Sequence, residues 1–341
     1  MQNSLITRIT TNWKAYTLLM AVLLNSSLAQ AEPNRPECIA PAQPGGGFDL
    51  TCRLAQSALR DTKVLQAPMR IIYMPGGVGA VAYNNIIAQR PADGNAVVAF
   101  SGGSLLNLAQ GKFGKYTVND VRWLASVGAD YGVAIVRNDS PHQDLKSLME
   151  AFKTNPTKIV LGAGGSIGSQ DWMKAALTAR AAGVDYKKMR FVAFEGGGEA
   201  ITALRGGHIQ AYMGDAAEAV TMLDGGAPIR VLAIYHNERL PGKLANVPTA
   251  TEQGFHIEWP IIRGFYVGPQ VSDADYGWWQ QAFDTTMATP AFAKSQERLG
   301  LFPFNKTGAE LDAYIKARIK DYTALAKSFE LRNLCITRFH A

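Results

Sequence analysis

The chain has 341 residues, of which 47% are hydrophobic and 18% are charged, and it contains 33 Gly but only 3 Cys. This length is enough for roughly two domains, and the low cysteine count excludes a small disulfide-rich scaffold. The formal charge of +6 comes from Lys and Arg residues dispersed along the chain, which disfavours a nucleic-acid-binding protein.

The first 31 residues predict a secretory signal peptide. Arg8 and Lys14 precede a largely apolar run, residues 15–24, and small residues surround an expected cleavage point after Ala31. The apolar run is too short to anchor the chain in a membrane. We therefore expect the chain to be exported.

Export to an oxidising compartment makes a disulfide possible. The three thiols allow three single pairings, of which Cys38 with Cys52 is the candidate that leaves Cys335 unpaired. We expect no metal site, because the five His residues show no ligand spacing with one another or with Cys.

Six copies of one unit follow along the chain, each with a short apolar run, a glycine-rich turn and a segment of helical periodicity. The first three apolar runs and their turns are residues 37–42 with 44–49, 69–73 with 75–79, and 96–100 with 101–104. The last three are residues 158–161 with 162–168, 190–194 with 195–199, and 209–213 with 214–216.

Two further helices have predicted start signals. Ser140 is expected to be the N-cap of a helix between the third and fourth units, with Pro141 at its first position and Gln143 completing a capping box. A long helix near the C-terminus is expected to begin with a capping box formed by Thr307 and Glu310.

Strands that alternate with helices predict an α/β fold with two domains built on mostly parallel sheets. Two groups of units predict two lobes, one formed by residues 32–126 plus 262–341 and the other by residues 127–261. The apolar runs 131–136, 229–234 and 264–267 are candidate strands that cross between the lobes. Such crossings form a hinge, so we expect a central ligand cleft.

The glycine-rich turns are suited to binding an anion. Each is expected at the carboxyl end of a strand and at the start of a helix, where backbone N–H groups and the helix dipole favour negative charge. The alternative is that these glycines only make tight turns. On that interpretation Asp49 is only an N-cap, Trp172 only a core residue and Glu195 only part of a solvated turn.

The sequence contains no recognisable catalytic motif. Residues 76–81 follow a predicted strand but do not fit G-x-G-x-x-G, and we find neither a P-loop nor a nucleophile elbow. We therefore predict a binding protein with no catalytic residue and no cofactor.

Several motifs resemble those of one family, the periplasmic substrate-binding proteins of tripartite tricarboxylate transporters, also called Bug receptors. They are residues 44–49, 74–79 with 88–94, 165–168, 194–200 with 204–207, and 247–255. The resemblance implies a two-lobed periplasmic-binding-protein-like fold that closes around a carboxylate held by backbone amides and water. It also implies a monomeric receptor that delivers its ligand to a permease of one large and one small membrane subunit.

Residues 37–42 together with 49–52 are most similar to the tricarboxylate-binding branch of this family, which makes citrate the expected ligand. An alternative from another class is a periplasmic carboxylate sensor that feeds a two-component signalling system. The sequence does not separate the two, because both require the same hinge.

The turns and the resemblance together imply a set of ligand-binding residues. The set is Gly45, Gly46, Gly47, Phe48, Asp49, Gly77, Val78, Gly79, Ser101, Gly102, Gly103, Ser104, Gly165, Ser166, Gly197, Gly198, Gly214 and Asp215. Asp49 is expected to cap the first helix, and Asp215 to select a ligand hydroxyl or fix a water molecule. Glu195 departs from the family pattern and is expected to face solvent or pair with a base, because an inward acid would repel a trianion.

Overall fold

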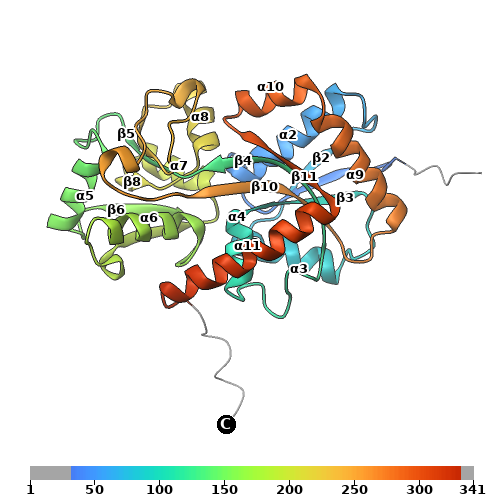
Figure 1. Cartoon of the computed structure of the whole chain (residues 1–341), viewed down its shortest axis with the longest axis horizontal. Helices are drawn as coiled ribbons and strands as arrows, with labels where there is room; N and C mark the ends of the chain where they lie inside the picture. The colour runs from blue at the N-terminus through green and yellow to red at the C-terminus, as the bar shows by residue number, and fades with distance from the viewer. Residues whose placement is uncertain (1–31, 332–341) are drawn as a thin grey trace, which may run out of the picture.

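The computed structural model describes residues 32–331 (Figure 1). The predicted signal peptide, its cleavage point and Cys335 lie outside the described residues. Within residues 32–331, no helix combines the length and the apolar character that a membrane crossing requires.

The first lobe is built around a six-stranded sheet with the order β11-β4-β10-β3-β1-β2. Its strands are β1 (Glu37–Ala40), β2 (Arg70–Tyr73), β3 (Ala96–Ser101), β4 (Arg122–Tyr131), β10 (Pro260–Val267) and β11 (Phe302–Thr307). Its helices are α2 (Gly47–Asp61), α3 (Ala80–Ala88), α4 (Gly102–Ala109), α9 (Asp273–Met287), α10 (Pro290–Arg298) and α11 (Gly308–Ser328).

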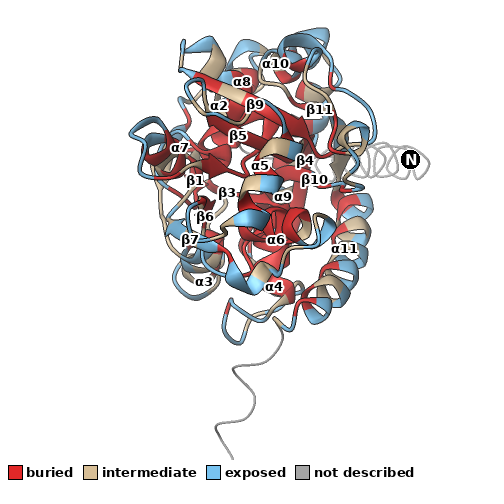
Figure 2. Ribbon diagram, turned by 90° about the vertical axis from the view of Figure 1, so that its left-hand side faces the viewer, coloured by how far each residue is buried: buried red, intermediate tan, exposed pale blue. Residues whose placement is uncertain are grey.

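The second lobe is built around a five-stranded sheet with the order β7-β6-β8-β5-β9. Its strands are β5 (Val133–Arg137), β6 (Val160–Gly164), β7 (Arg190–Phe194), β8 (Ala211–Tyr212) and β9 (Ile229–Ile234). Its helices are α5 (Leu145–Thr154), α6 (Gln170–Ala181), α7 (Gly197–Arg205) and α8 (Ala216–Asp224). In Figure 2 the buried residues gather on the strands, and the outer faces of the helices are exposed.

Both sheets are mixed, which corrects the expectation of mostly parallel sheets. Pairing is parallel only among the strands of the glycine-rich units, β1 with β2 and β3, and β6 with β7 and β8. The other pairings, which involve β4, β5, β9, β10 and β11, are antiparallel. The reason is that β4 carries the chain toward the second lobe and β10 carries it back, so the two strands run in opposite directions.

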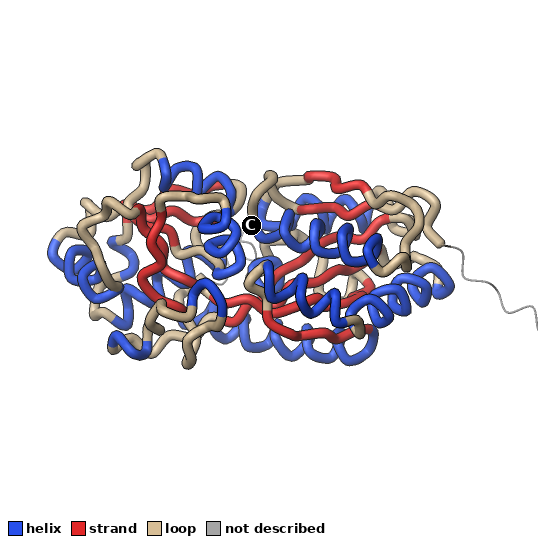
Figure 3. Tube along the Cα trace, turned by 90° about the horizontal axis from the view of Figure 1, so that it is seen from above, coloured by secondary structure: helices blue, strands red, loops and turns tan. Residues whose placement is uncertain are grey.

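The connection between the lobes is formed by β4 and β10, which pair along their lengths. Figure 3 shows the strands in two groups with strand segments passing between them. The predicted lobe boundaries after residues 126 and 261 fall inside these two strands.

A second connection is made by the end of α11. The Phe329 ring lies 5.0 Å from the ring of Tyr186 and 6.2 Å from that of Trp172, both of which belong to the second lobe. The predicted capping box of α11 is not formed: the Thr307 hydroxyl donates to Asp284, and Glu310 pairs with Lys306. Both side chains are thus bonded to other side chains and not to the backbone at the start of the helix.

The helix predicted to begin after Ser140 begins later. Its N-cap is Asp144, whose carboxylate accepts from the backbone N–H of Ser147 at 2.6 Å in a capping box. The carbonyl of His142 accepts from Arg230 at 2.9 Å, and that of Asn138 does so at 2.6 Å. Arg230 lies in β9, so these two carbonyls are bonded to a neighbouring strand. The first turn of the helix therefore forms after them.

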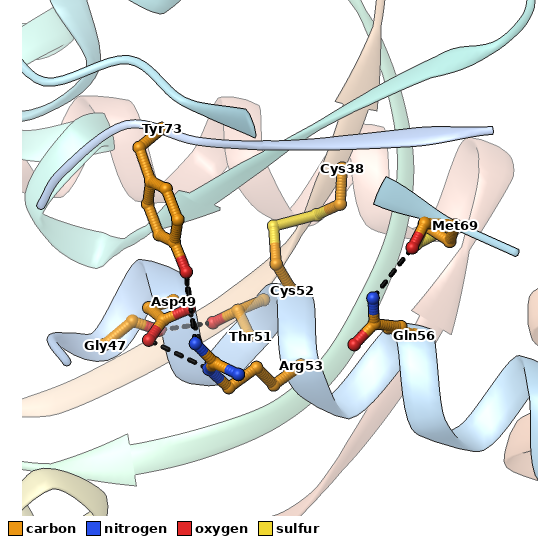
Figure 4. Close-up of a disulfide and its surroundings, with 9 residues drawn as sticks. All are labelled: Cys38, Gly47, Asp49, Thr51, Cys52, Arg53, Gln56, Met69 and Tyr73. Atoms are coloured by element: carbon orange, nitrogen blue, oxygen red, sulfur yellow. Dashed lines mark hydrogen bonds and ion pairs between the residues drawn. A yellow bond between two sulfur atoms is a disulfide. The ribbon is translucent and has the colours of Figure 1, made fainter. Parts of the chain in front are cut away.

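Cys38 in β1 and Cys52 in α2 form a disulfide, with their Cα atoms 5.7 Å apart (Figure 4). Both residues are fully buried. The bond closes the segment that contains the turn 44–49, so it ties the first turns of α2 to β1, the strand next to the sheet edge.

Replacing both cysteines by alanine is expected to lower the free energy of unfolding by about 3 kcal/mol, because a closed loop of this length restricts the unfolded chain. Urea unfolding of the double variant and of the wild type, with and without a reductant, measures the effect. The reduced wild type should unfold near the midpoint of the variant. Equal midpoints for the variant and the oxidised wild type would contradict the expectation.

Candidate functional site

A cavity of about 30 Å³ lies between the lobes at the carboxyl ends of the parallel strands. Its lining is Ala42, Gly46, Gly47, Phe48, Val78, Ser101, Gly164, Gln170, Asp171, Glu195, Gly196, Gly197, Tyr212, Asp215, Glu218 and Arg263. Each of the six predicted glycine-rich turns contributes at least one residue. This volume has room for water but is far below the roughly 300 Å³ or more of pockets that enclose small-molecule ligands, so we expect the lobes to separate when a larger molecule enters.

The turn before α2 brings the first lobe against the second. Gly47, in the first turn of the helix, donates its backbone N–H to Glu218 Oε1 at 2.8 Å. A Cβ atom on Gly47 would lie 2.1 Å from Arg263 Nη1, so a larger residue here would displace the Arg263 guanidinium.

Asp49 stabilises this turn from outside the cavity (Figure 4). It accepts from the backbone N–H of Gly45 at 2.9 Å, from Arg53 at 3.0 Å and from the Tyr73 hydroxyl at 2.8 Å. The N-cap of α2 is Gly46 and not Asp49, which was expected there. Asp49 lies in the first turn of the helix and binds the backbone of Gly45, the residue before the N-cap. Asp49 therefore positions the turn and does not line the cavity.

A buried ionic network joins the two lobes beside the cavity. Arg263 in β10 donates to Asp130 in β4, with Nη2 at 2.5 Å, and to Asp215 before α8 at 2.8 Å. Lys174 in α6 contacts Asp215 at 2.6 Å and Asp171 at 3.0 Å. All five residues are at most 3% exposed, so their charges interact in a medium of low polarity.

Glu218 and Tyr212 extend this network. The Tyr212 hydroxyl lies 2.9 Å from Glu218 Oε2 and 3.2 Å from Asp171 Oδ2. A hydroxyl has one proton and can donate to only one of the two carboxyls. The spacing is therefore best satisfied when one of these acids is itself protonated.

Burial and, after it, the charges of neighbouring groups shift the pKa values in this network. Burial, reinforced by Asp215 and Asp171, raises the pKa of Glu218 to about 8. Burial also raises the pKa of Asp171, against the attraction of Lys174. Burial opposes ionisation of Asp215 as well, but Lys174 and Arg263 outweigh it and lower the pKa of that carboxyl.

The predicted binding residues are only partly brought together. Those that line the cavity are Gly46, Gly47, Phe48, Val78, Ser101, Gly197 and Asp215. The others lie in the same turns but outside the lining, and they are Gly45, Asp49, Gly77, Gly79, Gly102, Gly103, Ser104, Gly165, Ser166, Gly198 and Gly214. Ser166 is exposed, and Ser104 accepts from the backbone N–H of Ser101.

Asp215 has partners on both of its oxygens, Lys174 on Oδ1 and Arg263 on Oδ2. Its visible role is to join the two cations and the two lobes. Glu195 is exposed at the rim of the cavity.

Sequence reasoning missed the buried polar residues around Asp215, namely Asp130, Gln170, Asp171, Lys174, Tyr212, Glu218 and Arg263. The sequence does contain a signal for two of these residues. Asp130 and Arg263 are single charges inside apolar strand sequences, and a charge at such a position needs a buried partner.

Two α/β lobes that are joined by paired strands and enclose a cavity at the ends of their strands define a two-lobed solute-binding protein. Residues 52–331 match the family described as "Tripartite tricarboxylate transporter family receptor", and the chain belongs to this family. The predicted family and the two-lobed α/β fold are thus confirmed.

Individual known proteins are similar over most of the chain. A UPF0065 protein of Bordetella pertussis is 26% identical over 311 residues, which cover 88% of this chain and 92% of that protein. The structure of the periplasmic binding protein BugD has a TM-score of 0.77 and 20% identity, covering 88% of this chain and 99% of its own. The structure of MatC from Rhodopseudomonas palustris with bound malate has a TM-score of 0.74 and 21% identity, covering 85% of this chain and 98% of the MatC chain.

Proposed function

We propose that the protein is a periplasmic receptor that captures a small carboxylate between its lobes and delivers it to the permease of a tripartite tricarboxylate transporter. The observation that carries the proposal is the convergence of all six glycine-rich turns on one cavity in a chain of this receptor family. The receptor would be exported after cleavage behind Ala31 and would act as a monomer without a cofactor. Its permease partners would be one large and one small membrane subunit.

The ligand carboxylate would be held by backbone N–H groups at helix starts. The nitrogens of Gly197 and Gly198 begin α7, and both lie 3.4 Å from where a Cβ on Gly46 would stand. Citrate is the ligand expected from the sequence, and a dicarboxylate is supported by the malate bound to a protein of similar fold.

We further propose that residues 32–126 plus 262–341 move as one lobe against residues 127–261. The hinge would lie in β4 and β10, where these boundaries fall. Opening at this hinge would break the bond between Gly47 and Glu218 and enlarge the cavity.

A thermal-shift screen tests the function. The chain from residue 32 onward would be heated with citrate, isocitrate, tricarballylate, malate, succinate, adipate and glutamate. A ligand at about 100 times its dissociation constant adds roughly 2.7 kcal/mol, which raises the midpoint by several degrees. A shift with citrate alone supports the tricarboxylate branch, a shift with dicarboxylates alone supports the receptor but not that branch, and no shift with any carboxylate contradicts the function.

Gly46→Val is expected to abolish ligand binding while the fold is retained. A Cβ at this position would already lie 3.4 Å from Gly197 and Gly198, so the methyl groups of valine would keep the lobes apart. The backbone φ of −97° accepts valine. Gly225→Ala, at the far end of α8, is the control, and unchanged affinity in Gly46→Val measured by calorimetry would contradict the assignment of the cavity.

A further inference from the structure

We propose that the groove between α8 and α10 is a second binding site and that it takes a small amphiphilic anion, an apolar body that carries one carboxylate. The inference goes beyond the proposed function, because it concerns another place on the molecule and another class of ligand. It does not depend on which molecule the cavity holds.

The groove has a volume of about 790 Å³ and is walled by both lobes. The second lobe contributes α8 and residues 241–243, and the first lobe contributes α10 and residues 300–303. Figure 1 shows the two helices at the same end of the molecule, one in each lobe. Pockets of about 300 to 1,000 Å³ are typical of small-molecule sites. The groove has this size without any movement of the lobes.

Helix α8 separates the groove from the cavity. Glu218 on this helix lines the cavity, whereas Val220 and Asp224 line the groove. Side chains two positions apart on a helix point about 200° away from each other. Gly300 of the first lobe lies against the groove side of α8, because a Cβ on it would be 3.0 Å from Val220 Cγ2. The groove and the cavity are therefore two sites on opposite faces of one helix.

The interior of the groove is largely apolar. Its buried lining residues are Val220, Leu301 and Gln296, at 7%, 4% and 2% exposure. The Nε2 group of Gln296 already donates to the Val127 carbonyl at 2.8 Å. Phe302 adds a half-buried ring to the lining. A hydrocarbon body would be removed from water against these side chains, which favours its binding.

The charged side chains of the groove leave an excess of cations. Lys243 and Asp224 form an ion pair, so their charges compensate each other. The other three charges, Lys294, Glu297 and Arg298 of α10, are exposed and have no ion-pair partner among the described residues. Lys294 and Arg298 are four positions apart and therefore lie on one face of the helix. An anionic head group would meet these two cations, whereas a cationic head group would meet Glu297 alone.

These properties together select the class of ligand. The apolar interior accepts a hydrocarbon body, and the two cations of α10 accept one anionic head group. A small molecule with two or three carboxylates does not fit, because it would place a charge against the apolar lining. The ligand would contact both lobes at once, because Val220 belongs to the second lobe and Leu301 to the first.

Calorimetric titration of the protein at pH 7 with octanoate, octan-1-ol and octylammonium tests the class of ligand. The three probes share a carbon chain and differ only in the charge of the head group. We expect octanoate to bind at least about threefold more tightly than either of the others, as an exposed ion pair provides.

Four variants locate the site. Lys294→Gln and Arg298→Gln should each weaken octanoate binding about threefold, because each removes one cation. Lys243→Gln on the second lobe should weaken it similarly, because Asp224 then stays unpaired. Ala293→Trp should abolish binding, because Ala293 lines the groove and the indole would fill it.

Matched controls lie on exposed helix surfaces elsewhere. Lys153→Gln on α5 removes a cation, and Ala324→Trp on α11 adds an indole, and both should bind octanoate like the wild type.

Each contrary outcome overturns a stated part of the proposal. Octan-1-ol or octylammonium binding as tightly as octanoate would overturn the anionic class. Octanoate that binds Ala293→Trp and Arg298→Gln as tightly as the wild type would occupy another place, such as the cavity, and would overturn the assignment to the groove. No binding of octanoate at millimolar concentrations would overturn the site itself. The receptor function is tested separately by the carboxylate screen.

Discussion

Arg263→Met is expected to lower the free energy of unfolding by about 3 to 5 kcal/mol, the usual cost of removing one partner of a buried ion pair. Arg263 is 1% exposed and is bonded to both Asp130 and Asp215. Without the guanidinium, Asp130 is left as a buried acid with no cation, and Asp215 keeps only Lys174. The substitution should destabilise both lobes, because Asp130 lies in β4 of the first lobe and Asp215 precedes α8 of the second.

Urea unfolding of Arg263→Met measures this cost. Arg239→Met is the matched control, because Arg239 and Glu252 form an ion pair whose side chains are 46% and 44% exposed. Pairs of this kind contribute about 0 to 1 kcal/mol. If the two variants lose equal stability, the buried network does not hold the lobes together.

The glycine-rich turns were predictable because their chemistry is local. A turn between a parallel strand and a helix needs glycine within a few residues, and the alternation of such turns with apolar runs indicated an α/β fold. All six turns do reach one cavity. The mixed pairing of the sheets was not predictable in this way. It depends on the directions of β4 and β10, whose paired residues Asp130 and Ile261 are 131 residues apart in sequence.

The ionic network was missed because its members are distant in sequence and share no motif. Asp130 and Arg263 are separated by 133 positions, and Gly47 and Glu218 by 171. Lys174 and Asp171 are three residues apart on α6, a spacing that is equally common on exposed helix faces. Only their complete burial separates this pair from a surface pair, and burial is set by the packing of the two lobes.

The wild-type protein is expected to lose stability as the pH rises from about 5 to about 9, because Glu218 is held protonated in the folded chain. Its pKa is raised from 4.5 to about 8 by burial, with Asp215 and Asp171 adding to the effect. A raised pKa of an acid stabilises the fold fully below the unfolded pKa, and this contribution is lost as the pH passes through the folded pKa. Since a tenfold change in proton affinity corresponds to about 1.4 kcal/mol, the loss is at most about 5 kcal/mol.

Glu218→Gln isolates this contribution, because glutamine keeps the shape and the acceptor for Gly47 but cannot ionise. The melting temperature of wild type and variant would be measured between pH 5 and pH 9. His142 also titrates in this window, but burial lowers its pKa, so it favours the fold as the pH rises and acts equally in both proteins. The melting temperature of the wild type should therefore fall relative to that of Glu218→Gln as the pH increases. Parallel curves would mean that Glu218 is ionised throughout, and the Tyr212 hydroxyl would then have to serve two charged carboxylates with one proton.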